Sequence, residues 1–120
     1  MEARGITAVV NMRVEFDDHE AGIAPPRYLH LRVVDDQAPT LEQLSKGAAF
    51  VTDEIARRGA VYVHCGSGIG RAATMAAGYF ISTGRTEQES WSLIRATRPF
   101  IRPTPPQVAQ IQRFAAETRG

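Results

Sequence analysis

The chain has one cysteine, Cys65, and one lysine, Lys46, among its 120 residues. A single cysteine excludes an internal disulfide and a zinc site built from several thiolates. The three histidines, His19, His30 and His64, show no spacing typical of a metal site, so we expect neither a metal nor a cofactor. Cys65 is therefore a free thiol, and its neighbours decide whether it is an inert core residue or a reactive group.

Excess charge of one sign and long apolar runs are also missing. The formal net charge of +1 gives no overall attraction to nucleic acid or to an anionic membrane. No apolar run is long enough to span a bilayer, and the start MEARGITAVVNMR does not resemble a secretory leader, so we expect a cytoplasmic protein. The length suits one compact unit, and we expect residues 1–120 to form a single domain.

Short apolar runs and amphipathic segments alternate along the chain. Residues 6–12, 28–34 and 60–65 are predicted to be buried parallel strands. Helices are predicted from 41 to just before Gly59, from near Gly70 to Gly84, from Thr86 to before Pro99, and from Thr104 onward. Three helix starts carry a capping box: Thr40 with Gln43, Thr86 with Glu89, and Thr104 with Gln107. The pattern indicates an α/β fold, a central mainly parallel sheet flanked by helices.

The first predicted helix also shows which side it buries. Its apolar residues recur at intervals of three and four: Leu41, Leu44, Ala48, Val51 and Ile55. This periodicity is typical of an amphipathic helix that buries its apolar stripe.

Cys65 lies between the third predicted strand and the second predicted helix, in a turn with glycines at 66, 68 and 70. Glycine allows backbone angles at which successive N–H groups converge on an anion beside the positive end of the helix dipole. The same field favours the thiolate and can lower the pKa of a cysteine from about 8.5 to roughly 3.5–7.5. The turn therefore predicts a phosphate site with an ionised nucleophile.

Arg71 follows Cys65 by six residues, in the first turn of the predicted helix. From there a guanidinium can fold back over the turn and hold two oxygens of a phosphate, which a lysine cannot do with the same geometry. His64 precedes Cys65. It either hydrogen-bonds locally and steadies the turn or simply packs at the strand end.

The segment HCGSGIGR resembles the signature of the protein tyrosine and dual-specificity phosphatase superfamily, whose pattern HCxxGxxR is met by Gly68 and Arg71. The resemblance implies a compact phosphatase domain in which Cys65 attacks phosphorus and forms a phosphocysteine. It also implies a substrate-binding loop made of Gly66, Ser67, Gly68, Ile69, Gly70 and Arg71. The substrate would be a phosphorylated protein, with phosphotyrosine and also phosphoserine or phosphothreonine open, or a small phosphomonoester.

The resemblance also covers two further segments. VVDDQAPTLEQL is similar to small prokaryotic-type members of the family, which places the general acid at Asp35, with Asp36 as the alternative. In RPFIRPTPPQ, Gln107 falls where a family glutamine approaches the active-site water. The same side chain also completes the capping box with Thr104, and these two roles compete.

Two features depart from the family pattern. Most relatives carry Ser or Thr directly after the motif arginine, whereas this chain has Ala72, which suggests slow hydrolysis of the phosphocysteine. Relatives also commonly have further elements before the first strand found here. Without them the strand that ends at Cys65 forms an exposed sheet edge, so we expect a monomer or a dimer through that edge.

Other functions were weighed against phosphatase activity. A pseudophosphatase that binds phosphorylated ligands without turnover and a lipid or small-molecule phosphatase both remain open. A sulfurtransferase rarely has an arginine that closes the loop, and an arsenate reductase normally needs further cysteines. A dinucleotide site is disfavoured because GSGIG does not match the G-x-G-x-x-G fingerprint.

Overall fold

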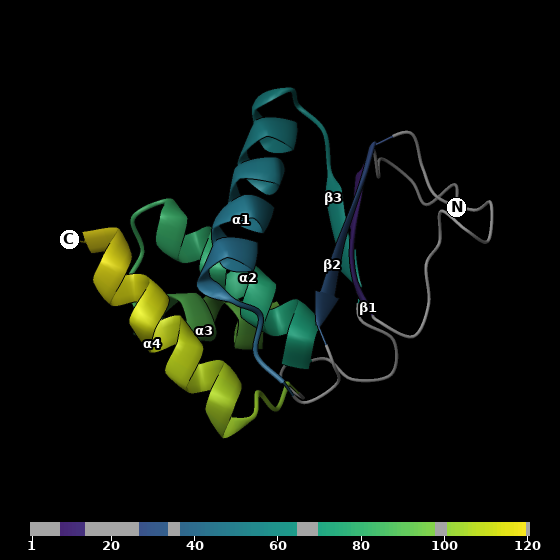
Figure 1. Cartoon of the computed structure of the whole chain (residues 1–120). Coiled ribbons are helices and arrows are strands. Elements are labelled where there is room, and N and C mark those ends of the chain that lie inside the picture. Colours follow the sequence, from purple (N-terminus) through teal and green to yellow (C-terminus); the bar gives the residue numbers. More distant parts are fainter. Residues whose placement is uncertain (1–7, 14–26, 34–36, 65–69, 98–100, 120) are drawn as a thin grey trace.

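The computed structural model of the chain describes residues 8–13, 27–33, 37–64, 70–97 and 101–119. The strands are β1 (Ala8–Arg13), β2 (Arg27–Val33) and β3 (Val61–His64). The helices are α1 (Leu41–Ala56), α2 (Gly70–Ser82), α3 (Glu87–Thr97) and α4 (Pro105–Arg119) (Figure 1). The predicted α/β fold is confirmed, and every predicted strand and helix is present close to its expected position.

The described strands form one parallel sheet in the order β2-β1-β3. Ala8 of the central strand pairs with Arg27 on one side and with Val61 on the other. Because all strands run the same way, their carboxyl ends meet at one edge of the sheet. α/β proteins usually place ligands at this edge. β3 pairs with no second strand among the described residues, in agreement with the edge position expected for it.

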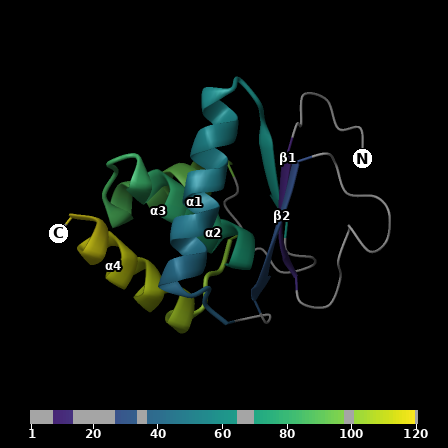
Figure 2. The same cartoon turned by 45° about the horizontal axis from the view of Figure 1, so that its top comes forward.

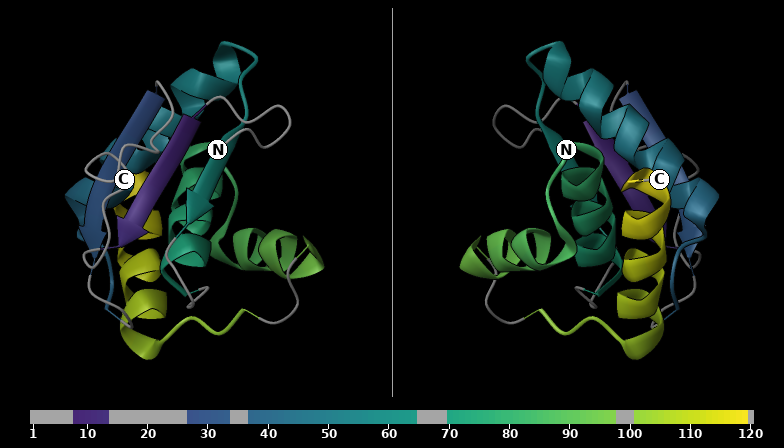
Figure 3. Two further views of the ribbon diagram at one scale, coloured as in Figure 1. Left: turned by 90° about the vertical axis from the view of Figure 1, so that its right-hand side faces the viewer. Right: turned by 90° about the vertical axis from the view of Figure 1, so that its left-hand side faces the viewer.

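The described helices lie on one side of the sheet, as Figures 1 and 2 show. α1 and α2 pack nearest the strands, α4 lies alongside α2, and α3 projects beyond the β3 side of the sheet (Figure 3). The strand residues facing this helical layer join the helices in one core, to which the sheet contributes Val10, Met12, Leu31 and Val33. This core fixes the carboxyl ends of β1 and β2 against α2.

Two glycines allow α1 and α2 to approach closely. A Cβ atom added to Gly78 of α2 would lie 2.9 Å from Cδ2 of Leu44, and one added to Gly47 of α1 would overlap the side chain of Met75. Leu44 and Met75 are fully buried. The space that a side chain at either glycine would need is therefore already filled by the core.

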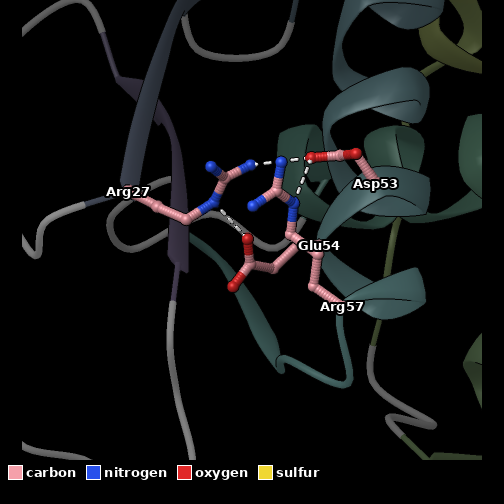
Figure 4. Close-up of polar contacts among 4 residues, drawn as sticks. All are labelled: Arg27, Asp53, Glu54 and Arg57. Carbon is pink, nitrogen blue, oxygen red and sulfur yellow. Dashed lines mark hydrogen bonds and ion pairs between the residues drawn. The ribbon is translucent and has the colours of Figure 1, made fainter.

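The last turn of α1 differs from the prediction. Ile55, expected in the buried stripe, is 45% exposed, whereas Glu54 is only 3% exposed. Arg27, the first residue of β2, pairs with Glu54 and also reaches Asp53 at 2.9 Å, which in turn pairs with Arg57 at 3.1 Å (Figure 4). This ion-pair network turns the charged side of the helix end toward the strand and leaves Ile55 in solvent.

The helix starts follow the predicted capping chemistry. In α1 the Thr40 N–H donates to Gln43 Oε1 at 2.9 Å and the Gln43 N–H donates to Thr40 Oγ1 at 3.0 Å. The corresponding pair at α3, Thr86 and Glu89, has distances of 2.9 and 3.1 Å. The sequence therefore locates these helix starts correctly from local hydrogen bonding alone.

The end of α1 is less regular than predicted. Gly59 was expected to stop the helix, but the left-handed residue is Arg58, with φ of 63°. The Gly59 N–H closes the end by donating to the Glu54 carbonyl at 2.9 Å. The left-handed position of this helix end is thus occupied by a residue with a Cβ atom.

Candidate active site

Arg71 lies in the first turn of α2, at the carboxyl edge of the sheet, and is 1% exposed. Its Nη1 donates to the Val33 carbonyl at 2.8 Å and to the Met12 carbonyl at 3.4 Å. Val33 ends β2, and Met12 lies next to the last residue of β1. One buried guanidinium therefore ties two strand ends to the start of α2, and the carbonyl dipoles offset part of the cost of burying its charge.

Most of the predicted site residues lie outside the described part of the chain: Cys65, Gly66, Ser67, Gly68, Ile69, Asp35 and Asp36. His64 is the last residue of β3 and Gly70 the first of α2, so the described chain stops and resumes at the two ends of the predicted phosphate loop. Val33 is the last residue of β2 and precedes Asp35 by two residues, so the segment predicted to carry the acid leaves the sheet at this same carboxyl edge. The roles of these residues stay predictions.

Gln107 is 1% exposed and lies in the first turn of α4. Its Oε1 accepts from the Thr104 N–H at 2.9 Å, as the capping role requires. Its Nε2 donates to the Gln37 carbonyl at 3.0 Å, a contact that the sequence did not suggest. These described contacts are those of a helix cap and a link between segments, and the predicted approach to a catalytic water stays untested.

A second glutamine of α4 makes a similar link. Gln110 Nε2 donates to the Pro39 carbonyl at 2.9 Å. Pro39 lies directly before Thr40, the cap of α1. Two amides one turn apart therefore fasten α4 to the segment that connects β2 with α1.

The hydroxyl of Thr74 is committed to its own helix. Thr74 is fully buried, and its Oγ1 donates to the Gly70 carbonyl at 2.6 Å. Ala72, after the motif arginine, is half-buried and carries no hydroxyl. The Thr74 hydroxyl therefore donates to the backbone of α2 and is not directed to the place of a hydroxyl on residue 72.

A polar side-chain pair links β1 and β2. Asn11 is fully buried in β1, and its Nδ2 donates to the Tyr28 hydroxyl of β2 at 2.8 Å. Asn11 also stands in register with His64, the residue before Cys65. Sequence reasoning did not single out Asn11, although a polar residue inside the apolar run ITAVVNM was the available signal.

Comparisons with known proteins identify the family of the chain. The family model of the dual specificity phosphatase catalytic domain matches residues 1–117. The chain belongs to the dual specificity phosphatase family.

Among individual relatives, human Dual specificity protein phosphatase 1 is 28% identical over 119 residues, covering 98% of this chain and 32% of the relative. Human Phosphatidylglycerophosphatase and protein-tyrosine phosphatase 1 is 35% identical over 88 residues, covering 72% of this chain and 44% of the relative. The chain thus spans less than half the length of these curated relatives.

Two solved structures share the fold. The crystal structure of PTPMT1 in complex with PI(5)P has a TM-score of 0.84 and 29% identity, and the match covers 95% of this chain and 79% of that chain. Human DUSP28 has a TM-score of 0.84 and 21% identity, with 96% and 80% covered. Among the residues that the structure describes, no helix is both long and apolar enough to cross a membrane.

Proposed function

We propose that the chain hydrolyses phosphomonoesters through a phosphocysteine intermediate. In this proposal Cys65 is the nucleophile, Arg71 the phosphate clamp, and Asp35 the general acid and then base. The observation that carries it is the buried Arg71 guanidinium, held at the start of α2 by the carbonyl ends of β1 and β2. A cation fixed there, six residues after a lone cysteine in a glycine-rich turn, suits a dianionic phosphate.

The first step of the proposed reaction forms the phosphocysteine. The Cys65 thiolate attacks phosphorus while the bond between phosphorus and the ester oxygen breaks. Asp35 gives its proton to that oxygen, so the alcohol or phenol leaves neutral.

In the second step, water attacks the phosphocysteine, the bond between sulfur and phosphorus breaks, and Asp35 takes the proton from the water. Inorganic phosphate leaves, and the Cys65 thiolate is regenerated. Asp35 thus ends the cycle protonated, ready for the next ester.

Arg71 and the loop amides stabilise the phosphoryl group as charge develops on its oxygens. The two carbonyl bonds of Nη1 support this role because they fix the orientation of the planar guanidinium before the substrate arrives. Because the guanidinium is already oriented, it does not have to reorient during the reaction.

Phosphate release from p-nitrophenyl phosphate tests the proposal. Wild-type protein should turn the substrate over, and Cys65→Ser should abolish turnover while it keeps oxyanion binding. Turnover that survives Cys65→Ser would sink the mechanism. If wild type and Cys65→Ser are both silent at every pH and both bind tungstate, the chain is a phosphate-recognising pseudophosphatase.

The choice of acid has its own test. Asp35→Asn should lower kcat/KM far more for phenyl phosphate than for p-nitrophenyl phosphate, whose leaving group needs little protonation. It should also remove the fall of kcat/KM on the alkaline side of the pH profile, because that fall reports deprotonation of the acid. If Asp36→Asn gives this pattern and Asp35→Asn does not, the acid is Asp36.

Two substrate classes follow from the relatives. The family match favours phosphoproteins, and the similarity to PTPMT1, solved with PI(5)P, favours a lipid phosphate as the second candidate. The loop from Gly66 to Gly70 has no lysine, which weighs against highly charged phosphoinositides. The ratio of kcat/KM values decides between these two classes. It is measured with phosphotyrosine, phosphoserine and phosphothreonine peptides, with PI(5)P and with phosphatidylglycerophosphate, each with Cys65→Ser as control.

A further inference from the structure

Gln107 contacts three separate parts of the chain. Besides its bonds to Thr104 and Gln37, it packs directly against Gly70, the first residue of α2. A Cβ atom added to Gly70 would lie 2.6 Å from Gln107 Oε1 and 3.2 Å from its Nε2. The amide thus fills the space between the start of α2, the start of α4 and the segment after β2.

Helix capping alone does not explain this burial. Gln43 has the same capping role at α1, and its Nε2 also donates to the Arg32 carbonyl at 3.1 Å, yet Gln43 is only half-buried. Glu89 has the capping role at α3 and is exposed. Gln107 is 1% exposed, and its contact with Gly70 distinguishes it from both.

The positions of these two contacts in the sequence suggest their function. Gln37 comes two residues after Asp35, and Gly70 comes five residues after Cys65. Gln107 therefore holds the described end of the acid-bearing segment against the described end of the nucleophile loop. A general acid must lie within hydrogen-bond reach of the leaving oxygen, and a displacement of about 1 Å can cost roughly 10²-fold in rate.

We infer that Gln107 is a positioning residue that sets the distance between the general acid and the phosphate loop. The inference rests on the proposed phosphatase function. Gln107 acts through Gln37 and Gly70 and does not itself meet the substrate. Loss of the link should therefore impair proton donation to the leaving group more than attack on phosphorus.

Gln107→Met tests this role, because methionine has a similar volume and length but no amide. We expect kcat/KM for phenyl phosphate to fall by about tenfold or more, and that for p-nitrophenyl phosphate by less than about threefold. Gln110→Met is the matched control, since Gln110 makes the same kind of bond to Pro39 from the same helix. It should change the ratio of the two kcat/KM values by less than about twofold.

Gln107→Glu separates the bond to Gln37 from the capping bond with Thr104. It is also the variant to test if Gln107→Met does not fold. The carboxylate keeps an acceptor for the Thr104 N–H but has no donor for the Gln37 carbonyl. It should show the same selective loss on phenyl phosphate. Equal losses on both substrates, or no loss, in the folded variants would overturn the inference.

The two proposals fail in different ways. If wild type shows no turnover, or Cys65→Ser retains it, the proposed function is wrong. If wild type is active, Cys65→Ser is silent and the Gln107 variants do not discriminate between the substrates, the positioning role alone is wrong.

Discussion

At the scale of single residues, Arg71 has a structural role besides its proposed role as phosphate clamp. Arg71 is buried at the carboxyl edge, and its Nη1 donates to the carbonyls of Val33 and Met12. A buried carbonyl without a donor costs about 1–3 kcal/mol. The proposed phosphate clamp is therefore also a support for the ends of β1 and β2, so stability and activity should depend on it together.

Arg71→Lys separates in part the contribution of Arg71 to activity from its contribution to stability. Lysine keeps the charge but not the planar fork, so we expect kcat/KM to fall by about 10²–10³-fold. Loss of the bonds from Nη1 to the two carbonyls should also lower the Tm. Steady-state kinetics and thermal unfolding measure both effects, with Arg113→Lys, at an exposed position of α4, as control. Near-wild-type kcat/KM in Arg71→Lys would contradict the clamp.

Ala72 governs the second proposed step. Since Thr74 donates its hydroxyl to Gly70, we expect phosphocysteine hydrolysis to be slow and a burst of released alcohol to precede the steady state. Ala72→Ser supplies a hydroxyl beside the clamp, so the burst should shrink and the steady-state rate should rise. Stopped-flow product release checks this, with Ala76→Ser, one turn along the half-buried side of α2, as control. An unchanged burst in Ala72→Ser would contradict the explanation.

At the scale of elements, the contact of α1 with α2 positions the start of α2, which directly follows the predicted phosphate loop. Gly47 faces the fully buried Met75, and Gly78 faces the equally buried Leu44. Any side chain that separates these helices would move the start of α2 relative to the sheet. Helix packing and site geometry are therefore coupled through two glycines.

Gly47→Val tests this coupling. The added side chain must displace Met75 in a filled core, so we expect a loss of about 1–3 kcal/mol in the free energy of unfolding. Ala49→Val places the same residue at an exposed position of α1 and should cost no more than about 0.7 kcal/mol. Urea denaturation of both variants gives the comparison. A loss in Gly47→Val no larger than that in Ala49→Val would contradict the packing explanation, because helix propensity alone favours valine over glycine.

The elements were predictable where local chemistry decides them. Helix starts at Thr40 and Thr86 follow from side chains that bond within the same turn. Ile55 was assigned to the wrong side because the last turn of α1 is oriented by Arg27, a residue far away in the sequence. Periodicity within one helix contains no information about such a partner.

The candidate site was predictable to the same extent. The spacing of Cys65 and Arg71 predicts a phosphate loop, because residue types and intervals carry that chemistry, and of these two residues the structure describes Arg71. The partners of Arg71 and Gln107 are backbone carbonyls of Met12, Val33 and Gln37. Their positions depend on strand register and helix packing, and no residue type reveals them.

At the scale of the whole molecule, the parallel sheet gathers sequence-distant groups at one edge. The ends of β1 and β2 meet the start of α2 where Arg71 lies, although Met12 and Val33 precede Arg71 by 59 and 38 residues. An anion bound at this edge would contact segments from most of the chain. Binding should therefore stabilise the folded state as a unit.

Tungstate should raise the Tm of both wild type and Cys65→Ser. At about 100 times the dissociation constant the expected stabilisation is about 2.7 kcal/mol, a shift of several degrees for a chain of this size. Arg71→Met, which lacks the cation, should show little or no shift. Thermal unfolding with and without tungstate provides the measurement. An equal shift in Arg71→Met would mean that the anion binds elsewhere.

The left-handed backbone of Arg58 offers a practical advantage for these experiments. A residue with a Cβ atom at φ of 63° carries a steric penalty that glycine avoids, so Arg58→Gly should raise stability by up to about 1 kcal/mol, which thermal unfolding would register. Arg58 lies at the end of α1, near the start of β3 and away from the carboxyl edge. In the more stable Arg58→Gly background, destabilising substitutions of Arg71 and Gln107 should leave the protein folded under assay conditions, so that the kinetics of the variants can be compared.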